Sequence, residues 1–266
     1  MSNLLLDLRS LLESSNAGIS PAGLAALAFL ALAALLFAIA LVKMSGTFRV
    51  SLRPLRGYEQ MLEATGEAAE SGQAIHLSAG SGSVGAAATV DTLAGVNAVA
   101  ALVAKAATSQ VATVITTASA VVLPLLQAAS EQAYSKAGAS AEYDPARVRF
   151  AGDDRNVYAV SVCDVLLHEP VGTSLLLGSL GEETLLIGER GQMAGVVQVT
   201  GTANTRALPY AIATADHVLL GEEIYAAGAY LTGQASHLAS LLVQDWLRLI
   251  VVGAILAGVI AKTAGW

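Results

Sequence analysis

An unbroken apolar run from Ala22 to Val42 constrains this chain more than any other feature of its sequence. A helix over these 21 residues would be about 30 Å long, which is the hydrocarbon thickness of a bilayer. A cleaved signal peptide is the alternative, but its apolar region is only about 7–15 residues long and follows a basic segment. The residues ahead of the run instead carry Asp7, Arg9 and Glu13. We therefore expect a retained transmembrane helix over residues 22–42, after a short extracytoplasmic segment over residues 1–21.

A second apolar segment lies near the other end of the sequence. Residues 249–261 are apolar, and Trp246 and Trp266 bracket a 21-residue stretch that contains them. Tryptophan favours the membrane interface, so this spacing predicts a second transmembrane helix over residues 246–266. A helix lying on the membrane surface is the alternative.

Basic residues crowd just after the first apolar run, and they predict the topology: Lys43, Arg49, Arg53 and Arg56. Positive residues near transmembrane helices stay on the cytoplasmic side. We therefore expect a basic juxtamembrane segment and acidic helical linker over residues 43–73, and a cytoplasmic domain over residues 74–245. The expected location is the cytoplasmic membrane, with the bulk of the chain facing the cytoplasm and the lipid bilayer as its first partner.

The charge of the predicted cytoplasmic part excludes some functions. Residues 57–245 carry seven Lys and Arg against nineteen Asp and Glu, a net charge of −12. Such a surface repels phosphate backbones, so nucleic acid is not an expected partner. Cys163 is the single cysteine, which excludes an intramolecular disulfide and a cysteine-based metal cage. We predict no metal ion and no cofactor.

Apolar runs typical of strands alternate with longer helical patterns along the predicted domain. This alternation predicts an α/β fold, in which a mostly parallel sheet carries helices on both faces, Rossmann-like and flanked by the two transmembrane helices. The strands are expected over residues 74–78, 111–116, 147–150, 174–177, 196–200 and 210–213. The helices are expected over residues 86–107, 118–137, 155–168, 182–189, 222–231 and 234–246. Residues 106–130 contain no charge; we expect a buried strand, turn and helix there, and a membrane-touching segment stays open as the alternative.

The sharpest motif is the turn Gly80-Ser81-Gly82-Ser83-Val84-Gly85. It fits G-x-G-x-x-G, follows a predicted strand and opens a predicted helix, which is the setting of a dinucleotide-binding turn. Gly80, Gly82 and Gly85 are therefore the predicted ligand-binding residues, for a nucleotide or another small anionic ligand. The next strand ends in Thr116 and Thr117, with no acid to hold a ribose. A plain strand-to-helix turn is the alternative. If the turn binds an anion, Gly82→Val should abolish binding and leave the domain folded.

The remaining chemistry-bearing residues predict structure more than catalysis. Asp216-His217 with Glu222 and Glu223 could serve a metal or acid–base chemistry, but acids in a first helical turn also complement the helix dipole. Asp153 and Asp154 before a helix are typical of a cap. Cys163 is expected to be a buried structural thiol. We predict no catalytic residue, and a pocket uniting His217, Glu222 and Asp154 would favour an enzyme.

Several stretches together resemble a known family: residues 147–150 with 158–160, 201–203, 213–223, 225–231 and 237–241. The chain is similar over roughly residues 45–260 to a family of uncharacterised prokaryotic membrane proteins. Its members have a terminal pair of transmembrane helices around a cytoplasmic domain of unknown function. The resemblance implies the architecture and supplies no activity.

Three functions remain open from the sequence. The leading one is a membrane-anchored structural or assembly protein, which forms a homo-oligomer through its membrane helices and its acidic cytoplasmic domain. The small residues Gly253, Ala254, Ala257 and Gly258 favour it, because they let another helix approach closely. The alternatives are a nucleotide- or anion-binding sensory module that uses the Gly80–Gly85 turn, and an enzyme acting on a nucleotide or lipid-linked substrate.

Overall fold

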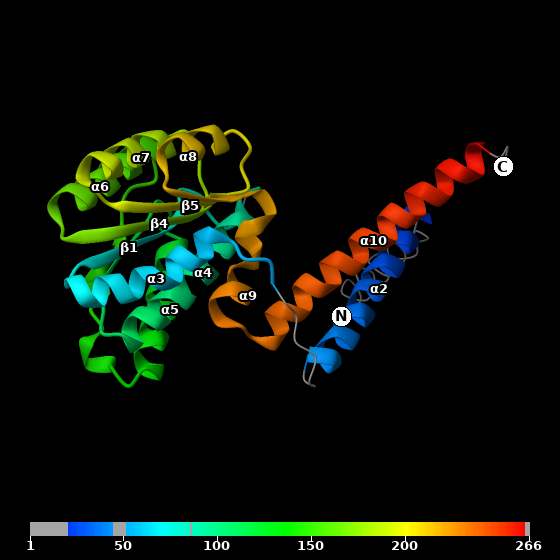
Figure 1. Ribbon diagram of the computed structural model, residues 1–266, viewed down its shortest axis with the longest axis horizontal. Coiled ribbons are helices and arrows are strands. Elements are labelled where there is room, and N and C mark those ends of the chain that lie inside the picture. The colour runs from blue at the N-terminus through cyan, green and yellow to red at the C-terminus, as the bar shows by residue number, and fades with distance from the viewer. Residues whose placement is uncertain (1–20, 45–51, 86, 264–266) are drawn as a thin grey trace, which may run out of the picture. The chain divides into compact units, whose positions relative to one another are not determined.

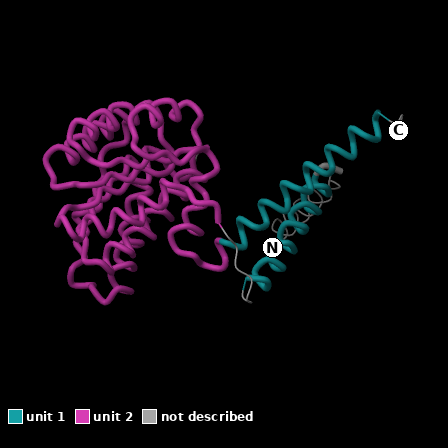
Figure 2. Tube along the Cα trace, in the orientation of Figure 1, with its two compact units in different colours: residues 1–50, 238–266 teal, residues 51–237 magenta. Residues whose placement is uncertain are grey.

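A computed structural model describes residues 21–44, 52–85 and 87–263. The chain divides into two compact units, one of residues 1–50 and 238–266 and one of residues 51–237 (Figure 2). The predicted extracytoplasmic segment up to residue 20, part of the basic juxtamembrane segment and Trp266 lie outside the described residues.

The larger unit is built on a six-stranded parallel sheet, with the strand order β3-β2-β1-β4-β5-β6. All five neighbouring strand pairs are parallel. The mostly parallel α/β sheet expected from the sequence is therefore confirmed. The strands are β1 (Ala74–Gly80), β2 (Thr113–Thr117), β3 (Val148–Phe150), β4 (Val171–Ser179), β5 (Val197–Thr202) and β6 (His217–Leu220).

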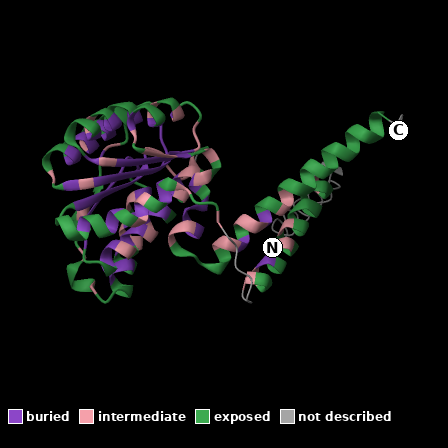
Figure 3. Cartoon of the chain, in the orientation of Figure 1, coloured by how far each residue is buried: buried purple, intermediate pink, exposed green. Residues whose placement is uncertain are grey.

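Burial explains which segments form the central strands. Every residue of β1 and β2 is buried, as are nearly all of β4 and β5 (Figure 3). Parallel strands covered on both faces need near-continuous apolar or small residues, which these runs provide. The edge strands β3 and β6 are shorter and partly exposed.

Helices cover both faces of the sheet (Figure 1). One face carries α3, α4 and α5, and the other carries α6, α7 and α8. Between β6 and the last helix, a 3₁₀ segment (Gly221–Ala226) leads into the short α9 (Ala227–Thr232). The covering helices are α3 (Arg56–Ser71), α4 (Thr89–Thr108), α5 (Val122–Lys136), α6 (Arg155–His168), α7 (Glu183–Ala194) and α8 (Leu208–Thr214).

Two local expectations were wrong. Residues 210–213 form part of α8 and not a strand, because Pro209 starts that helix at its first turn, where proline is tolerated. The sixth strand is instead β6 (His217–Leu220). The helix expected over residues 222–231 is a 3₁₀ segment followed by α9. Residues 106–130 are the end of α4, then β2, then most of α5, which agrees with the expected buried strand, turn and helix.

Helix α3, expected as part of a linker, packs into the domain. Its Tyr58 is buried and stacks on Tyr230 of α9, with the ring centroids 4.7 Å apart. The Tyr58 hydroxyl also donates a hydrogen bond of 2.6 Å to the backbone carbonyl of Glu223. Burial is the main cause that raises the pKa of Tyr58, so this hydroxyl stays a neutral donor.

In the part of the chain that the structure describes, three helices are long and apolar enough to cross a membrane: Gly23–Met44, Thr89–Thr108 and Ala235–Thr263. The second is α4, which is half-buried against β1 and β4 of the sheet. The other two are α2 (Pro21–Met44) and α10 (Ala235–Thr263), most of whose side chains are exposed. Long, apolar and exposed helices of this kind indicate association with a membrane.

A candidate ligand-binding crevice at the carboxyl edge of the sheet

The strand order places a topological switch between β1 and β4. The chain leaves β1 toward β2 and β3 on one side, and leaves β4 toward β5 and β6 on the other. In open parallel sheets, the loops diverge at such a point and ligands bind beyond the carboxyl ends of the two strands. Here the Gly-rich turn follows β1, and residues 180–182 follow β4.

Two of the three predicted glycines are packed closely against neighbouring residues of the domain. Gly80 has a φ of +84°, and a Cβ added to it would lie 2.3 Å from the carbonyl oxygen of Ser179. A Cβ on Gly82 would lie 2.5 Å from both the Ser179 Cβ and the Thr92 Oγ1. The turn therefore needs glycine in order to pack on β4 and α4. Gly85 has open space around its Cβ position, and α4 begins only at Thr89. Ligand binding by these glycines stays a prediction.

A buried carboxylate stands against this turn. Glu183, the first residue of α7, is only 5% exposed. Its Oε1 accepts a hydrogen bond of 2.5 Å from the Ser81 hydroxyl and one of 2.8 Å from the Gly181 backbone N–H. Its Oε2 has no hydrogen-bond partner among the residues that the structure describes. The same holds for Thr92 Oγ1, which is fully buried beside Gly82.

A pocket of about 360 Å³ adjoins this carboxylate, between the first turns of α6 and α7. Asp154 caps α6 as predicted, because its Oδ1 accepts hydrogen bonds from the backbone N–H groups of Asn156 and Val157 at 2.8 and 3.2 Å. Four carboxyl groups and one guanidinium group surround the pocket, so its potential opposes phosphate. Its lining residues are Asp153, Asp154, Arg155, Asn156, Glu182 and Glu183.

Neutral polar groups lie beneath the crevice. The Tyr158 hydroxyl is 2.6 Å from the Ser78 hydroxyl at the end of β1. Burial raises the pKa of Tyr158, and nearby Glu183 raises it further, while the hydrogen bond with Ser78 opposes the shift. His76 is fully buried between the hydroxyls of Ser174 and Thr116, at 2.8 and 2.9 Å. Burial, followed by the charge of Arg149, lowers the pKa of His76 to about 3.

The acid–base cluster considered from the sequence does not assemble. His217 starts β6 at one edge of the sheet, whereas Asp154 follows β3 at the other edge. The Glu223 carboxylate instead accepts hydrogen bonds from the Leu220 backbone N–H and from Arg53. The described residues contain no group of His, Cys, Asp or Glu side chains suited to a metal ion. Cys163 is buried on α6 as expected, and burial raises the pKa of its thiol.

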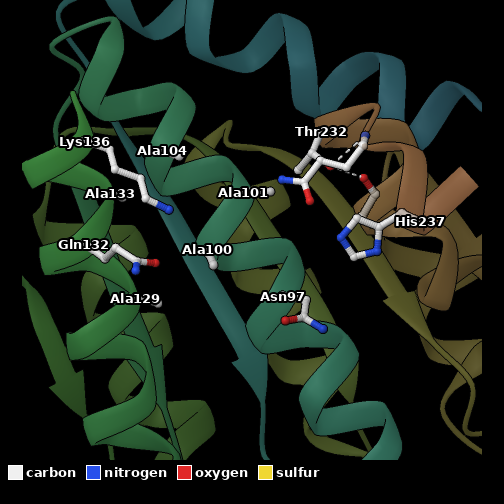
Figure 4. Close-up of a pocket in the computed structure, with 12 residues that line it drawn as sticks. Asn97, Ala100, Ala101, Ala104, Ala129, Gln132, Ala133, Lys136, Thr232 and His237 are labelled. Carbon is white, nitrogen blue, oxygen red and sulfur yellow. Dashed lines mark hydrogen bonds between the residues drawn. The ribbon is translucent and has the colours of Figure 1, made fainter. Parts of the chain in front are cut away.

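A second hollow of about 220 Å³ crosses the outer face of α4 (Figure 4). Lys136 and Gln132 reach it from α5 and His237 from the start of α10, over the alanines of α4. Lys136 and Gln132 are exposed and His237 is partly exposed, so water can satisfy their polar atoms. The crevice differs because Glu183, which lines its pocket, is buried and its Oε2 has no hydrogen-bond partner among the described residues, and we therefore take the crevice as the candidate site.

Sequence reasoning missed Glu183 and Arg155. Both stand in the first turn of a predicted helix, where an acid is ordinary because it complements the helix dipole, and a single arginine carries no functional signal. The available signal was Gly181-Glu182-Glu183, directly after a buried strand. It becomes informative only once β4 is known to lie beside β1.

The fold and the crevice define a class: a doubly wound α/β domain in a chain that also carries long apolar helices. Within it, the chain belongs to a family described as a domain of unknown function (DUF6754), which matches residues 21–266. The expected membership of an uncharacterised family is thereby confirmed. No curated protein and no solved structure gives a significant match.

Proposed function

We propose that this protein is a membrane-anchored binding module, whose α/β domain takes up a small polar ligand in the carboxyl-edge crevice. The observation that carries this proposal is the buried Glu183 carboxylate, which lines the pocket and whose Oε2 has no hydrogen-bond partner among the described residues. An unsatisfied buried polar group costs about 1–3 kcal/mol. A ligand that donates a hydrogen bond to Glu183 Oε2 would remove that cost.

The test is to identify what the protein carries. The full chain is purified into lipid nanodiscs without added ligand, denatured, and the released small molecules are identified by mass spectrometry. Gly181→Val should reduce the released molecule at least tenfold, because its Cβ would lie within 3 Å of Glu183 Oε2 and Arg155 Nη1 and would displace both groups. Gly66→Val is the matched control, since a Cβ there meets nothing within 4 Å. Equal amounts from both variants, or no bound molecule in the wild type, would remove the proposal.

Self-assembly is a second candidate, supported by the small-residue face of α10. Helix α2 packs against the first half of α10 through Ala40, Ala239 and Val243. At about 100° per residue, the same face continues as Gly253 and Ala257, and Gly258 lies at the border of this face. A Cβ at Gly253 or Gly258 would meet none of the described atoms within 4 Å. A helix from a second copy could pack there, which supports a homo-oligomer.

The membrane placement is part of the same proposal. We propose that α2 and the apolar half of α10 cross the cytoplasmic membrane and hold the α/β domain on the cytoplasmic side. The support is the basic cluster that begins in the last turn of α2 with Lys43 and continues with Arg53 and Arg56. In this arrangement the lipid bilayer is the first partner, and the acidic domain would repel nucleic acid.

A further inference from the structure

A carboxylate and a guanidinium flank Gly181 without pairing. A Cβ on Gly181 would lie 2.7 Å from Glu183 Oε2 and 2.8 Å from Arg155 Nη1. Both side chains line the same pocket. Among the described residues, neither has an ion-pair partner within 4.0 Å. Opposite charges that stand this close and remain unpaired leave one acceptor and one donor side by side.

The two groups have complementary and fixed hydrogen-bonding roles. An ionised carboxylate only accepts hydrogen bonds, and a guanidinium only donates them. A ligand group that satisfies both must donate to Glu183 and accept from Arg155. A phosphate or carboxylate would satisfy Arg155 but meet Glu183 and the carboxylates of Asp153, Asp154 and Glu182. An ammonium would satisfy Glu183 but would be repelled by Arg155.

A neutral amide-type edge meets both requirements, because its N–H donates and its adjacent carbonyl accepts. We propose that the ligand enters this pocket through such an edge, a carboxamide or the lactam edge of a nucleobase, with Glu183 as acceptor and Arg155 as donor. This inference rests on the proposed function, since it describes the ligand of the same crevice. The ligand inferred here differs from the anion that the Gly-rich turn predicted: the group that is recognised is neutral, and it binds on the β4 side of the crevice.

Nicotinamide and nicotinate test the inference, because they differ only in a carboxamide against a carboxylate. Binding to the full chain in nanodiscs is measured by saturation-transfer NMR. We expect nicotinamide to bind at least tenfold more tightly than nicotinate. Glu183→Gln should reverse this preference, because the new amide nitrogen can donate to a carboxylate while its oxygen keeps the hydrogen bonds from Ser81 and Gly181. Glu189→Gln changes an exposed acid of the same helix that does not line the pocket, and it should keep the wild-type preference.

The outcomes separate this inference from the proposed function. Equal or tighter binding of nicotinate, a preference unchanged in Glu183→Gln, or no binding of either probe overturns the amide-edge inference. A molecule that is released from the wild type and lost in Gly181→Val would still support the binding module in each of these cases. A circular dichroism spectrum of Glu183→Gln that matches the wild type establishes that the variant is folded.

Discussion

Gly95 of α4 lies directly against the backbone of β4: a Cβ at this position would stand 2.3 Å from the carbonyl oxygen of Leu177. It would also lie 3.1 Å from the Cα of Ala79 in β1. In a dinucleotide-binding turn, the third glycine of the motif allows the helix to pack closely on the sheet. In this protein Gly95 has that role, and Gly85 lies before the helix with open space around it.

Gly95→Ala should therefore destabilise the α/β domain. The added methyl group meets backbone atoms on two strands, which cannot rotate away, so we expect a loss of about 1–3 kcal/mol. Calorimetric unfolding of the full chain measures it, because both tryptophans of the sequence, Trp246 and Trp266, lie outside residues 51–237. Gly66→Ala on α3 is the control, and it should stabilise slightly, because nothing lies within 4 Å of its Cβ position. Similar stabilities for both variants would contradict the close packing of α4.

Gly82→Val should also lower the stability, which revises the expectation that it leaves the domain folded. The new Cβ would lie 2.5 Å from the Ser179 Cβ and from the Thr92 Oγ1. Gly82→Ala should show the same effect in weaker form, and adding Ser179→Gly should recover part of the lost unfolding free energy. Calorimetry on Gly82→Val, on Ser179→Gly and on the variant that carries both changes gives the coupling free energy between positions 82 and 179. A Gly82 variant as stable as the wild type would mean that the turn has space for a ligand phosphate.

The sequence predicted the layers of the fold better than its edges. The strands β1 and β4 were predicted because they are buried runs with little polarity, bounded by helical patterns. The edge strand β6 has four residues and is partly exposed, so it has no continuous apolar signal. Residues 210–213 resemble a strand in composition, but Pro209 and the following apolar residues suit a short helix that packs on α7.

Only half of the candidate site, the Gly-rich turn, could be predicted from the sequence. The Gly-rich turn is local, so its position at the carboxyl end of β1 followed from the sequence. The partner of Ser81 is Glu183, which is 102 residues away along the chain. No spacing rule connects residues at that separation; they meet because β4 pairs with β1, and not with β3. The burial of Glu183 then identifies it as a candidate site residue, because an acid in the first turn of a helix is ordinary when it is exposed.

His76 should make the domain sensitive to acid. Its pKa in the folded protein is lowered to about 3 from an ordinary value of 6.5, so the unfolded chain binds a proton at higher pH than the folded chain does. Stability is therefore lost as the pH falls from about 6.5 toward 3, by about 1.4 kcal/mol per pH unit for this group.

Denaturant unfolding at pH 6.5 and pH 5 measures this loss, which should be about 2 kcal/mol for His76 alone. His76→Gln keeps a donor and an acceptor between Ser174 and Thr116 and should flatten the acid dependence. His168→Gln changes an exposed histidine, and the acid dependence of the stability should stay nearly as in the wild type. An unchanged acid dependence in His76→Gln would show that His76 is protonated or solvated in the folded state.

The proposed topology predicts which cysteines are accessible in intact cells. In a Cys163→Ala background, a thiol reagent that cannot cross the membrane should react with Ser2→Cys and not with Ser71→Cys. Ser71 ends α3 on the exposed surface of the α/β domain, so the reagent should reach it once the cells are lysed. Labelling of Ser71→Cys in intact cells would reverse the orientation, and with it the cytoplasmic location of the crevice.

The open face of α10 predicts a change in particle mass. Replacing Gly253 and Gly258 with Leu would place large side chains where a second helix could otherwise approach closely, and contact between small residues is what holds helices together in lipid. We expect the wild type to be larger than a monomer in mild detergent, and the double variant to shift toward the monomer mass by light scattering. Val252→Leu with Val259→Leu is the control, because these residues lie on the opposite face of the same helix and are exposed. The α/β domain should unfold at the same temperature in all three proteins. A wild type that is monomeric at every protein and salt concentration would remove the assembly proposal and leave the binding module.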